Sequence, residues 1–371
     1  MIYCSGRVLP DSILIREMEV SEVKEDSLLM LLAPEMLESA EERYTILREI
    51  HASQPVGRHL LVVQTKLSES TIRNHVEYME RTGLLVLKPG GMILTSKGES
   101  FLTSLSRYFR KSSSLTELER KLSSILSMKR VIVLRGDADT SEEVKKGISR
   151  EAALLLTGLI HDHDVVAIGG GEVMAGVMNS MPAFHMPVDV LPACGTVGRK
   201  VEYLPNVVAA RLAERLGGTY HIMQIPEGLS PDLYRQVKNA LPQSKVMDAL
   251  YAKVRILVTG INDFEDMMKW HEFPTDVKDR LIKEKAQGES LGLFADQSGT
   301  ILYRLYHAGL TKEDIPSIPH VVMAAGGRHK GKAILAMARA GIRGTLVTDE
   351  GAAEEILAVY GTHSNRRVQK S

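Results

Sequence analysis

The chain has 371 residues, of which 44% are hydrophobic and 25% charged, and its formal net charge is zero. This length suits two domains, the composition is typical of a well-packed soluble protein, and zero net charge excludes a general attraction of the whole chain to nucleic acid. The two cysteines exclude a disulfide framework and a zinc site built from four thiolates, and no cofactor is expected.

Residues 1–33 are mixed and weakly periodic, and we expect an N-terminal extension there. The apolar run 28–33 is too short to cross a membrane and follows acidic residues, so a cytoplasmic protein is expected. A helical pattern runs from 34 to about 50, ends at 54–57, and is followed by a second short helix over 58–66. The side chains expected to face inward are Tyr44, Leu47 and Ile50 in the first helix and Leu60, Leu61 and Val63 in the second.

Residues 67–98 predict a helix, a sharp stop and a two-stranded ribbon. Ser68 is a suitable N-cap and Gly83 a suitable residue to end the helix. Two short apolar runs follow, 84–87 and 92–94, and the Lys-Pro-Gly-Gly sequence between them is typical of a hairpin. The apolar face of the helix, at positions i, i+4 and i+7, is formed by Ile72, Val76 and Met79.

A short helix with a polar outer face and a basic hairpin is typical of a winged helix-turn-helix, so we predict a DNA-binding domain over 34–100. The local charge agrees, because residues 40–111 contain 11 Lys and Arg against 7 Asp and Glu. Arginine reads guanine and asparagine reads adenine in the major groove, whereas contacts to phosphate position the protein without specifying sequence. The expected DNA contacts are Ser70, Thr71, Arg73 and Asn74 on the helix facing the bases, and Arg58, Lys66 and Lys88 at the phosphates.

A second amphipathic run over 101–127 predicts a helical linker. Its apolar face has two possible partners, a second copy of the chain or the linker's own domain. Pairing with a second copy is favoured, because paired half-sites on DNA need a symmetric connection between two protomers.

From residue 128 onward, apolar β-branched runs alternate with helical segments. This alternation predicts an α/β domain over 128–371, with a mostly parallel sheet covered by helices on both faces. Ligands of such sheets bind at the carboxyl ends of the strands, so the loops there form the candidate site. The expected strands are 130–134, 165–168, 188–191, 221–225, 254–258 and 320–324.

Three glycine-containing loops follow expected strands, at 168–173, 192–198 and 324–331. The first loop lacks the dinucleotide fingerprint, because Met174 stands where the third glycine belongs. Its glycines serve either the approach of an anion to backbone N–H groups or close packing of strand and helix. The second loop indicates only that the backbone comes close to another group.

The loop 324–331 is the better anion candidate, because Arg328, His329 and Lys330 stand beside two glycines. We favour phosphate binding there over a solvated turn. The sequence His161-Asp162-His163-Asp164 superficially resembles a metal cluster. Four consecutive side chains point in different directions, however, so we predict a polar turn and no metal site.

The order of wing, linker and glycine-rich α/β domain resembles the SorC family of sugar-binding transcriptional regulators, and within it the branch that controls glycolytic genes. The resemblance spans about residues 36–360, and its most specific segments are 43–58, 324–335 and 346–353. It implies a bacterial repressor that binds operator DNA as a homo-oligomer, either a dimer or a tetramer. It also implies an effector domain with the fold of sugar-phosphate isomerases and deaminases but no catalytic residues. The ligand in that branch is fructose 1,6-bisphosphate.

Carried over to this chain, the family's ligand site is only partly kept. Lys330 matches a lysine that contacts phosphate, Glu289 matches a glutamate that contacts the sugar, and Gly170 and Gly171 keep the phosphate loop.

Other ligand-binding positions of the family carry different residues here. The replacements are Glu172 and Val173 for a threonine pair, Cys194 for an arginine, and Trp270 and His271 for a pair of arginines. Each charge-assisted hydrogen bond contributes about 1.5–3 kcal/mol, so these losses weaken the binding of a bisphosphate. We therefore expect a less anionic ligand, such as a sugar monophosphate, or the loss of a tight effector response.

The alternative function is an enzyme of the same fold, a sugar-phosphate isomerase or deaminase. Moving a proton on a sugar carbon needs a carboxylate or histidine beside the phosphate, and the candidates are Glu172, Asp263, Glu289 and His329. None lies in a pattern specific for that chemistry, so no catalytic residue is expected. A third possibility is a DNA-binding scaffold without a ligand.

Overall fold

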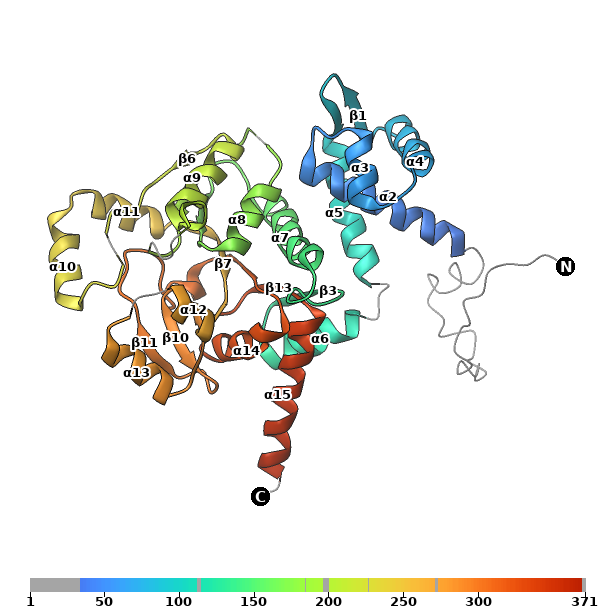
Figure 1. The fold of residues 1–371 in the computed structure, drawn as a ribbon. Helices are drawn as coiled ribbons and strands as arrows, with labels where there is room; N and C mark the ends of the chain where they lie inside the picture. The colour runs from blue at the N-terminus through green and yellow to red at the C-terminus, as the bar shows by residue number, and fades with distance from the viewer. Residues whose placement is uncertain are drawn as a thin grey trace.

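The computed structural model describes residues 34–111, 115–183, 185–195, 200–225, 227–270 and 273–368. The expected extension over 1–33 lies outside these ranges. The chain forms a small N-terminal lobe and a larger α/β lobe (Figure 1). Among the described helices, none is both long enough and apolar enough to span a membrane.

The small lobe contains the helices and the hairpin that the sequence predicted. Ser68 caps the third helix by accepting a hydrogen bond from the Thr71 N–H at 3.1 Å, and Gly83 follows the helix with φ of 73°. The predicted apolar face of this helix is confirmed, because Ile72, Val76 and Met79 are buried. The elements are α2 (Pro34–Ser53), α3 (Arg58–Thr65), α4 (Glu69–Arg81), β1 (Leu85–Lys88), β2 (Gly91–Leu94) and α5 (Ser96–Lys111).

The wing is an antiparallel hairpin in which Leu85 lies opposite Leu94. The chain before α3 joins it, since the Val56 and Met92 backbones exchange hydrogen bonds of 3.1 and 2.8 Å. Gly91 has φ of 131°, and a Cβ there would lie 2.7 Å from the Val56 oxygen. Glycine is therefore required at the point where the hairpin turns back.

The prediction that Leu60, Leu61 and Val63 all face inward was wrong for two of them. Leu61 is buried, but the side chains of Leu60 and Val63 are 46% and 61% exposed. Successive residues of a helix are rotated by about 100°, so residues 60, 61 and 63 cannot share one face. In α2, Leu47 and Ile50 are buried as predicted, and Tyr44 is half-buried against the same core.

The expected run over 101–127 forms two helices, α5 and α6 (Leu115–Leu126). Leu102 of α5 belongs to the core of the small lobe. Leu122 and Leu126 of α6 belong to the core of the large lobe. The two helices therefore extend the two lobes toward each other.

The large lobe is built on a seven-stranded parallel sheet, which confirms the predicted α/β fold. In spatial order the strands are β3 (Arg130–Leu134), β13 (Thr345–Asp349), β12 (His320–Ala324), β7 (Val254–Gly260), β4 (Val165–Ile168), β5 (Asp189–Pro192) and β6 (Thr219–Tyr220). The expected strand over 221–225 was wrong, because β6 is a short exposed edge strand without an apolar run. The strand β13 was not predicted.

Helices cover both faces of this sheet (Figure 1). One face is covered by α7 (Glu142–Thr157), α8 (Glu172–Ser180) and α9 (Pro205–Leu216). The opposite face is covered by α6, α11 (Gln243–Tyr251), α14 (Gly331–Arg339) and α15 (Glu350–Val368). The helix α10 (Pro231–Ala240) lies at the side of the lobe beside α11.

A four-stranded antiparallel sheet, which the sequence did not predict, packs beside the parallel one. Its core contains Phe294, whose ring packs edge-on against the Phe273 ring, with 5.3 Å between the ring centroids. The elements are β8 (Asn262–Asp263), α12 (Phe264–Trp270), α13 (Thr275–Lys283), β9 (Ala286–Ser290), β10 (Leu293–Asp296) and β11 (Ile301–Arg304). Short one-turn helices connect other elements: η2 (Val201–Tyr203), η3 (Ile315–Ser317) and η4 (Arg328–Lys330).

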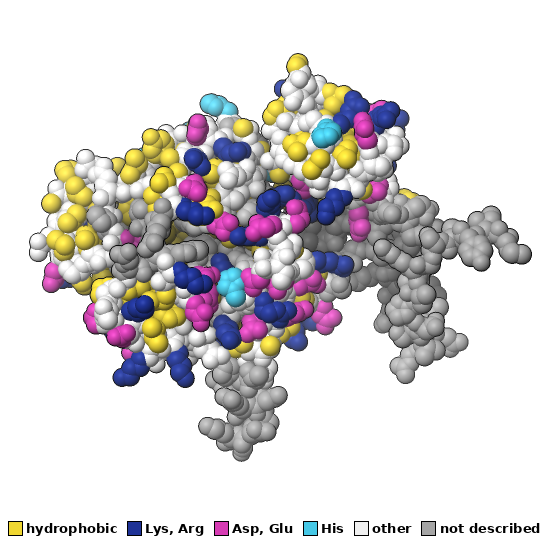
Figure 2. All heavy atoms as spheres, viewed as in Figure 1, with side chains coloured by type: hydrophobic (Ala, Val, Ile, Leu, Met, Phe, Trp, Pro, Cys, Tyr) yellow, Lys and Arg dark blue, Asp and Glu magenta, His cyan; other side chains and the backbone are white. Residues whose placement is uncertain are grey.

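The two lobes are in contact through α2 and α7. Arg150 of α7 donates to the buried carboxylate of Glu49 at 3.0 Å, and Leu154 packs into the core of the small lobe. A cavity of about 360 Å³ lies beside this contact. Figure 2 shows Lys, Arg, Asp and Glu side chains mixed along the boundary between the lobes.

Candidate functional site

The outer face of α4 is polar, and three of its predicted DNA contacts are exposed. Ser70, Arg73 and Asn74 all lie on this solvent-facing side. Thr71 is half-buried, and its hydroxyl lies 2.8 Å from the Ser68 hydroxyl that caps the helix. Thr71 therefore supports the start of α4, while its three neighbours are presented to solvent.

The three predicted phosphate contacts are exposed and lie on different elements of the small lobe. Arg58 begins α3, and Lys66 follows it in a left-handed conformation with φ of 58°. Lys88 is the last residue of β1, opposite Gly91 at the tip of the wing. Figure 2 shows Lys and Arg side chains gathered on the part of this lobe that carries α4.

The His75 side chain of α4 does not lie on the exposed face that carries the predicted DNA contacts. Its side chain is buried against α2, where it accepts a hydrogen bond from Arg43 at 3.1 Å and lies 2.7 Å from the Glu42 carboxylate. The Arg43 guanidinium also stacks 4.0 Å from the centre of the Tyr78 ring. These contacts fix α4 on α2, and their members are 32 and 33 residues apart along the chain, so no local pattern indicates them.

The second candidate site lies where the strand order of the parallel sheet reverses, between β4 and β7. Such a reversal leaves a crevice at the carboxyl ends of the strands. The Gly169 N–H donates to the Val258 oxygen at 2.8 Å and so joins the two strands at this point. The loops after β4, β5, β7 and β12 all end at this edge.

The glycine loop after β4 is tightly held. A Cβ on Gly170 would lie 2.7 Å from both the Tyr203 oxygen and the Pro205 ring. Gly171 has φ of 97°, and its N–H donates to the same Tyr203 oxygen at 2.8 Å. Close packing therefore accounts for Gly170 and the positive φ for Gly171, whose amide is already bonded within the chain.

Glu172 and Val173, which follow this loop, face α7. The Glu172 carboxylate pairs with the Lys145 ammonium at 2.7 Å. The Val173 side chain packs against the apolar core beneath α8, and its carbonyl accepts a hydrogen bond from Ser149 at 3.3 Å. The carboxylate at position 172 is thus partly neutralised by a cation of this chain.

Glu289 and Cys194 are two further candidate residues of the crevice. Glu289 is buried, and its two oxygens accept hydrogen bonds of 2.8 Å from the Asn262 amide and the Gly292 N–H. Burial raises the pKa of Glu289 against the effect of these two bonds. Burial, followed by the charges of Glu227 and Glu289, raises the pKa of the Cys194 thiol, whose sulfur accepts a hydrogen bond from the Gly170 N–H.

Lys330 is a half-buried cation at the end of β12. Burial lowers the pKa of its ammonium, and the charge of Asp266 acts in the opposite direction. Among the residues that the structure describes, no carboxylate lies within ion-pair distance of it. Lys330 is therefore available to an anionic ligand.

Arg328, in contrast, pairs with carboxylates of this chain. Its guanidinium contacts Glu354 and lies 3.7 Å from Asp137. The His329 ring is held between Asp139 at 2.5 Å and Asp266 at 3.1 Å. These two side chains fix the loop after β12 to its neighbours.

Backbone N–H groups of the same loop are also bonded to carboxylates. The Gly327 N–H donates to Asp349 at 2.8 Å, the Arg328 N–H to Asp137 at 3.2 Å, and the His329 N–H to Asp139 at 2.9 Å. The loop therefore resembles an anion-binding nest that the chain fills with its own acidic side chains.

Two parts of the predicted site lie outside the described residues. They are 196–199 in the loop after β5, and His271 together with the side chain of Trp270. The predicted turn at 161–164 is described, and Asp164 fixes it by accepting from the His161 N–H at 2.9 Å and pairing with Arg255 at 2.9 Å. No group of side chains suited to a metal ion occurs among the described residues.

Two residues of the crevice were missed as ligand-site candidates by sequence reasoning. Asn262 holds the Glu289 carboxylate, and it follows the predicted strand 254–258 closely enough to be found by its position at a strand end. Glu227 lies on the segment between β6 and α10, where no pattern in the sequence singles it out.

Comparison with known proteins assigns both lobes. Residues 40–109 match the family model described as the CggR N-terminal DNA-binding domain, and residues 110–358 match the sugar-binding domain model named Sugar-bind. The central glycolytic genes regulator of Priestia megaterium is 32% identical over 88% of this chain and 96% of its own length. The regulator of the same name from Bacillus subtilis is 29% identical over the same shares.

Solved structures agree with this assignment. A SorC family transcriptional regulator from Enterococcus faecalis matches with a TM-score of 0.59 and 29% identity, over 65% of this chain and 99% of that one. The full-length sorbitol operon regulator SorC from Klebsiella pneumoniae shares the fold, with a TM-score of 0.58 and 16% identity over 84% of this chain and 96% of that one. This chain belongs to the SorC family of transcriptional regulators and carries a DNA-binding domain followed by a sugar-binding domain.

Proposed function

We propose that this chain represses genes of sugar metabolism, glycolytic genes among them, and that a phosphorylated sugar controls its binding to operator DNA. The names of the two relatives support the choice of genes. The observation that carries the effector part is the half-buried Lys330 ammonium, which stands without a carboxylate partner among the described residues at the strand ends. Footprinting on the gene's own upstream region, with and without sugar phosphates, tests both parts together.

In the proposed complex α4 enters the major groove. Ser70, Arg73 and Asn74 read base edges from its exposed face, and Thr71 supports them from the helix start. Contacts to phosphate come from the exposed cations of α3 and the wing, which are Arg58, Lys66 and Lys88.

This division of labour predicts different effects for Arg73→Ala and Lys88→Ala. Loss of Arg73 should weaken binding to the preferred operator by about 1–3 kcal/mol, through one base pair, and should relax the sequence preference at that base pair. Loss of Lys88 should weaken binding to operator and random DNA alike, and should make the dependence of affinity on salt concentration shallower. Fluorescence anisotropy over a salt series, with both DNAs, measures these quantities.

Arg235→Ala is the matched control, since Arg235 is an exposed arginine of α10 in the other lobe. It should bind both DNAs as the wild type does. Equal losses on operator and random DNA for both Arg73→Ala and Lys88→Ala would contradict the proposed roles.

The proposed effector is a sugar monophosphate, with fructose 1,6-bisphosphate as the more anionic alternative. Its phosphate lies beside Lys330, next to the Gly170–Gly171 loop, and its sugar faces Glu289. Glu172, Val173 and Arg328 border the site without contributing a free cation, because Glu172 pairs with Lys145 and Arg328 pairs with Glu354. Cys194 supplies no charge where an arginine would bind a second phosphate. Calorimetric titration with both ligands tests this choice, and micromolar binding of the bisphosphate refutes it.

The proposed effector domain performs no catalysis and needs no cofactor. Both oxygens of Glu289 are occupied by Asn262 and Gly292, and an Asp263 oxygen accepts from the Glu265 N–H at 2.8 Å. These bonds hold both carboxylates in place, and neither lies in a pattern specific for moving a proton on a sugar. Turnover of sugar phosphates by the purified protein would support the isomerase or deaminase alternative instead.

We further propose a cytoplasmic homo-oligomer, a dimer or a tetramer, because paired half-sites on DNA match a symmetric protein. The proposed domain division keeps 1–33 as an extension, 34–100 for DNA binding, 101–127 as a linker and 128–371 for the effector. Light scattering on the purified protein, with and without operator DNA, measures the number of copies.

A further inference from the structure

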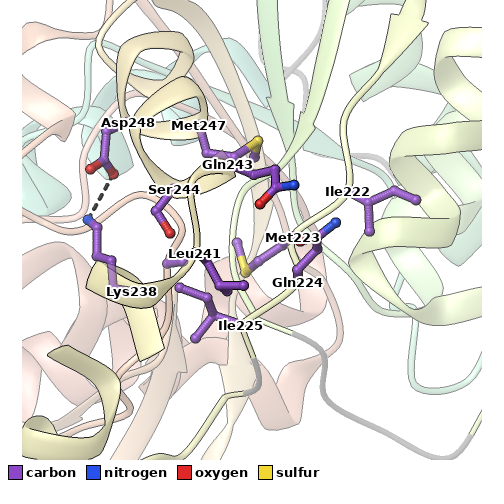
Figure 3. A pocket seen from close by; sticks show the side chains of 11 residues that line it. Ile222, Met223, Gln224, Ile225, Lys238, Leu241, Gln243, Ser244, Met247 and Asp248 are labelled. Atoms are coloured by element: carbon purple, nitrogen blue, oxygen red, sulfur yellow. Dashed lines mark ion pairs between the residues drawn. The ribbon is translucent and has the colours of Figure 1, made fainter. Parts of the chain in front are cut away.

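Glu227 carries a carboxyl oxygen that no described residue satisfies. Its Oε2 is buried and receives no hydrogen bond. The residue follows the segment 222–225, whose side chains meet those of α10 and α11 in the hollow shown in Figure 3. The Glu227 carboxyl lies against Gly195, where a Cβ would come within 2.5 Å of the same oxygen. A buried polar atom without a partner costs about 1–3 kcal/mol, and none of the described residues supplies a donor to this oxygen.

The surroundings of Glu227 place it in the crevice at the strand ends. The charges of Glu227 and Glu289 both act on the Cys194 thiol, and the Cys194 sulfur accepts from the Gly170 N–H. The four residues therefore lie near one another beside the glycine loop. Since Asn262 and Gly292 already satisfy the two oxygens of Glu289, the open acceptor at this point is Glu227 Oε2.

The carboxyl groups of Glu227 and Glu289 determine which charge on a ligand is favourable here. Burial, and then the neighbouring charge of Glu289, raises the pKa of Glu227 to about 8. Near neutral pH Glu227 is therefore mostly protonated, and the space around the two carboxyl groups disfavours further negative charge. A phosphate would add further negative charge to this space, whereas an ammonium or a hydroxyl would donate a hydrogen bond to it.

We propose that Glu227 determines the specificity of the ligand site: it binds the hydrogen-bond-donating end of a sugar monophosphate, prefers an ammonium to a hydroxyl, and rejects a second phosphate. This inference rests on the proposed function, because Lys330 must hold the single phosphate at the other end. Gly195 is part of the arrangement, since a larger residue there would occupy the space of the Glu227 carboxyl.

The test compares three ligands by calorimetric titration of the full chain. Glucosamine 6-phosphate and glucose 6-phosphate differ only by an amine in place of a hydroxyl, and fructose 1,6-bisphosphate adds a second phosphate. The wild type should bind the amino sugar about tenfold more tightly than glucose 6-phosphate, and the bisphosphate most weakly. In Glu227→Gln the preference for the amine should fall to about twofold or less, and binding of the bisphosphate should improve relative to the other two.

Two further variants separate specificity from folding. Glu214→Gln makes the same change on the exposed side of α9 and should keep the wild-type order of affinities. Glu227→Asp keeps the charge and should retain a preference for the amine even where the affinity for all ligands falls. Thermal unfolding without ligand shows whether each variant is folded.

The possible failures are distinguishable. Flat titrations with all three ligands in the wild type would overturn the proposed function, and this inference with it. Binding of the monophosphates with the same ratios in wild type and Glu227→Gln would overturn the inference alone. Tightest binding of the bisphosphate by the wild type, or equal loss of the amine preference in the Asp and Gln variants, would also overturn it.

Discussion

Replacing Lys330 with methionine should abolish the thermal stabilisation that a sugar monophosphate gives the wild-type protein. The ammonium is half-buried and has no carboxylate partner among the described residues. Its removal therefore takes away the cation that contacts the bound phosphate. One charge-assisted bond corresponds to about 1.5–3 kcal/mol, or roughly a 10- to 100-fold loss of affinity. Thermal shift against ligand concentration, followed by calorimetry, measures this loss, since ligand binding stabilises the native state.

Lys332→Met provides the control two residues further on. Lys332 is exposed on α14, and its ammonium lies 3.9 Å from Glu355, so the change should leave ligand binding intact. Without ligand, Lys330→Met should unfold at about the wild-type temperature. Wild-type affinity in a folded Lys330→Met protein would exclude this residue from the ligand site.

Gly98→Ala should destabilise the DNA-binding lobe by about 3 kcal/mol, because the new methyl group has no space. Gly98 lies in α5 where a Cβ would come within 2.0 Å of the Leu84 carbonyl oxygen, and this oxygen is backbone that leads into the wing. The wing and α5 must separate to accept it. Operator binding should be lost at a temperature at which the ligand still stabilises the effector domain, and anisotropy and thermal shift measure the two effects separately.

Gly361→Ala is the matched substitution in a helix with open space around it. Nothing lies within 4 Å of a Cβ at Gly361 of α15, so alanine should change stability by less than about 1 kcal/mol, in the favourable direction. A Gly98→Ala protein with wild-type stability would show that α5 and the wing can move apart without cost.

Much of the small lobe could be predicted because its signals are local. The apolar spacing of α4 and its Ser68 cap lie within a few residues of each other, and both are confirmed. The buried strands β3 and β12 were predicted with their exact bounds, since strands covered on both faces are continuous apolar runs. The two-residue edge strand β6 is exposed and has no such run.

The ligand site was less accessible to sequence reasoning, because its charges are set by distant partners. Arginine is a residue type that commonly binds phosphate, yet Arg328 pairs with Glu354 of α15. The carboxylates that bond to the Arg328 and His329 N–H groups, Asp137 and Asp139, lie 191 and 190 residues away in the sequence. Only the folded chain shows that the loop after β12 is occupied while Lys330 is available.

The helix α7 contacts both halves of the regulator within two turns. Lys145 pairs with Glu172 beside the glycine loop, and Arg150 pairs with Glu49 in the small lobe. Five residues of α-helix span only about 7.5 Å, over which a helix moves as one body. A shift of α7 would change both contacts at once, which supplies a route for the proposed control of operator binding by a sugar. Such coupling is reciprocal, so operator DNA must alter the dissociation constant of the sugar by the same factor by which the sugar alters that of the operator.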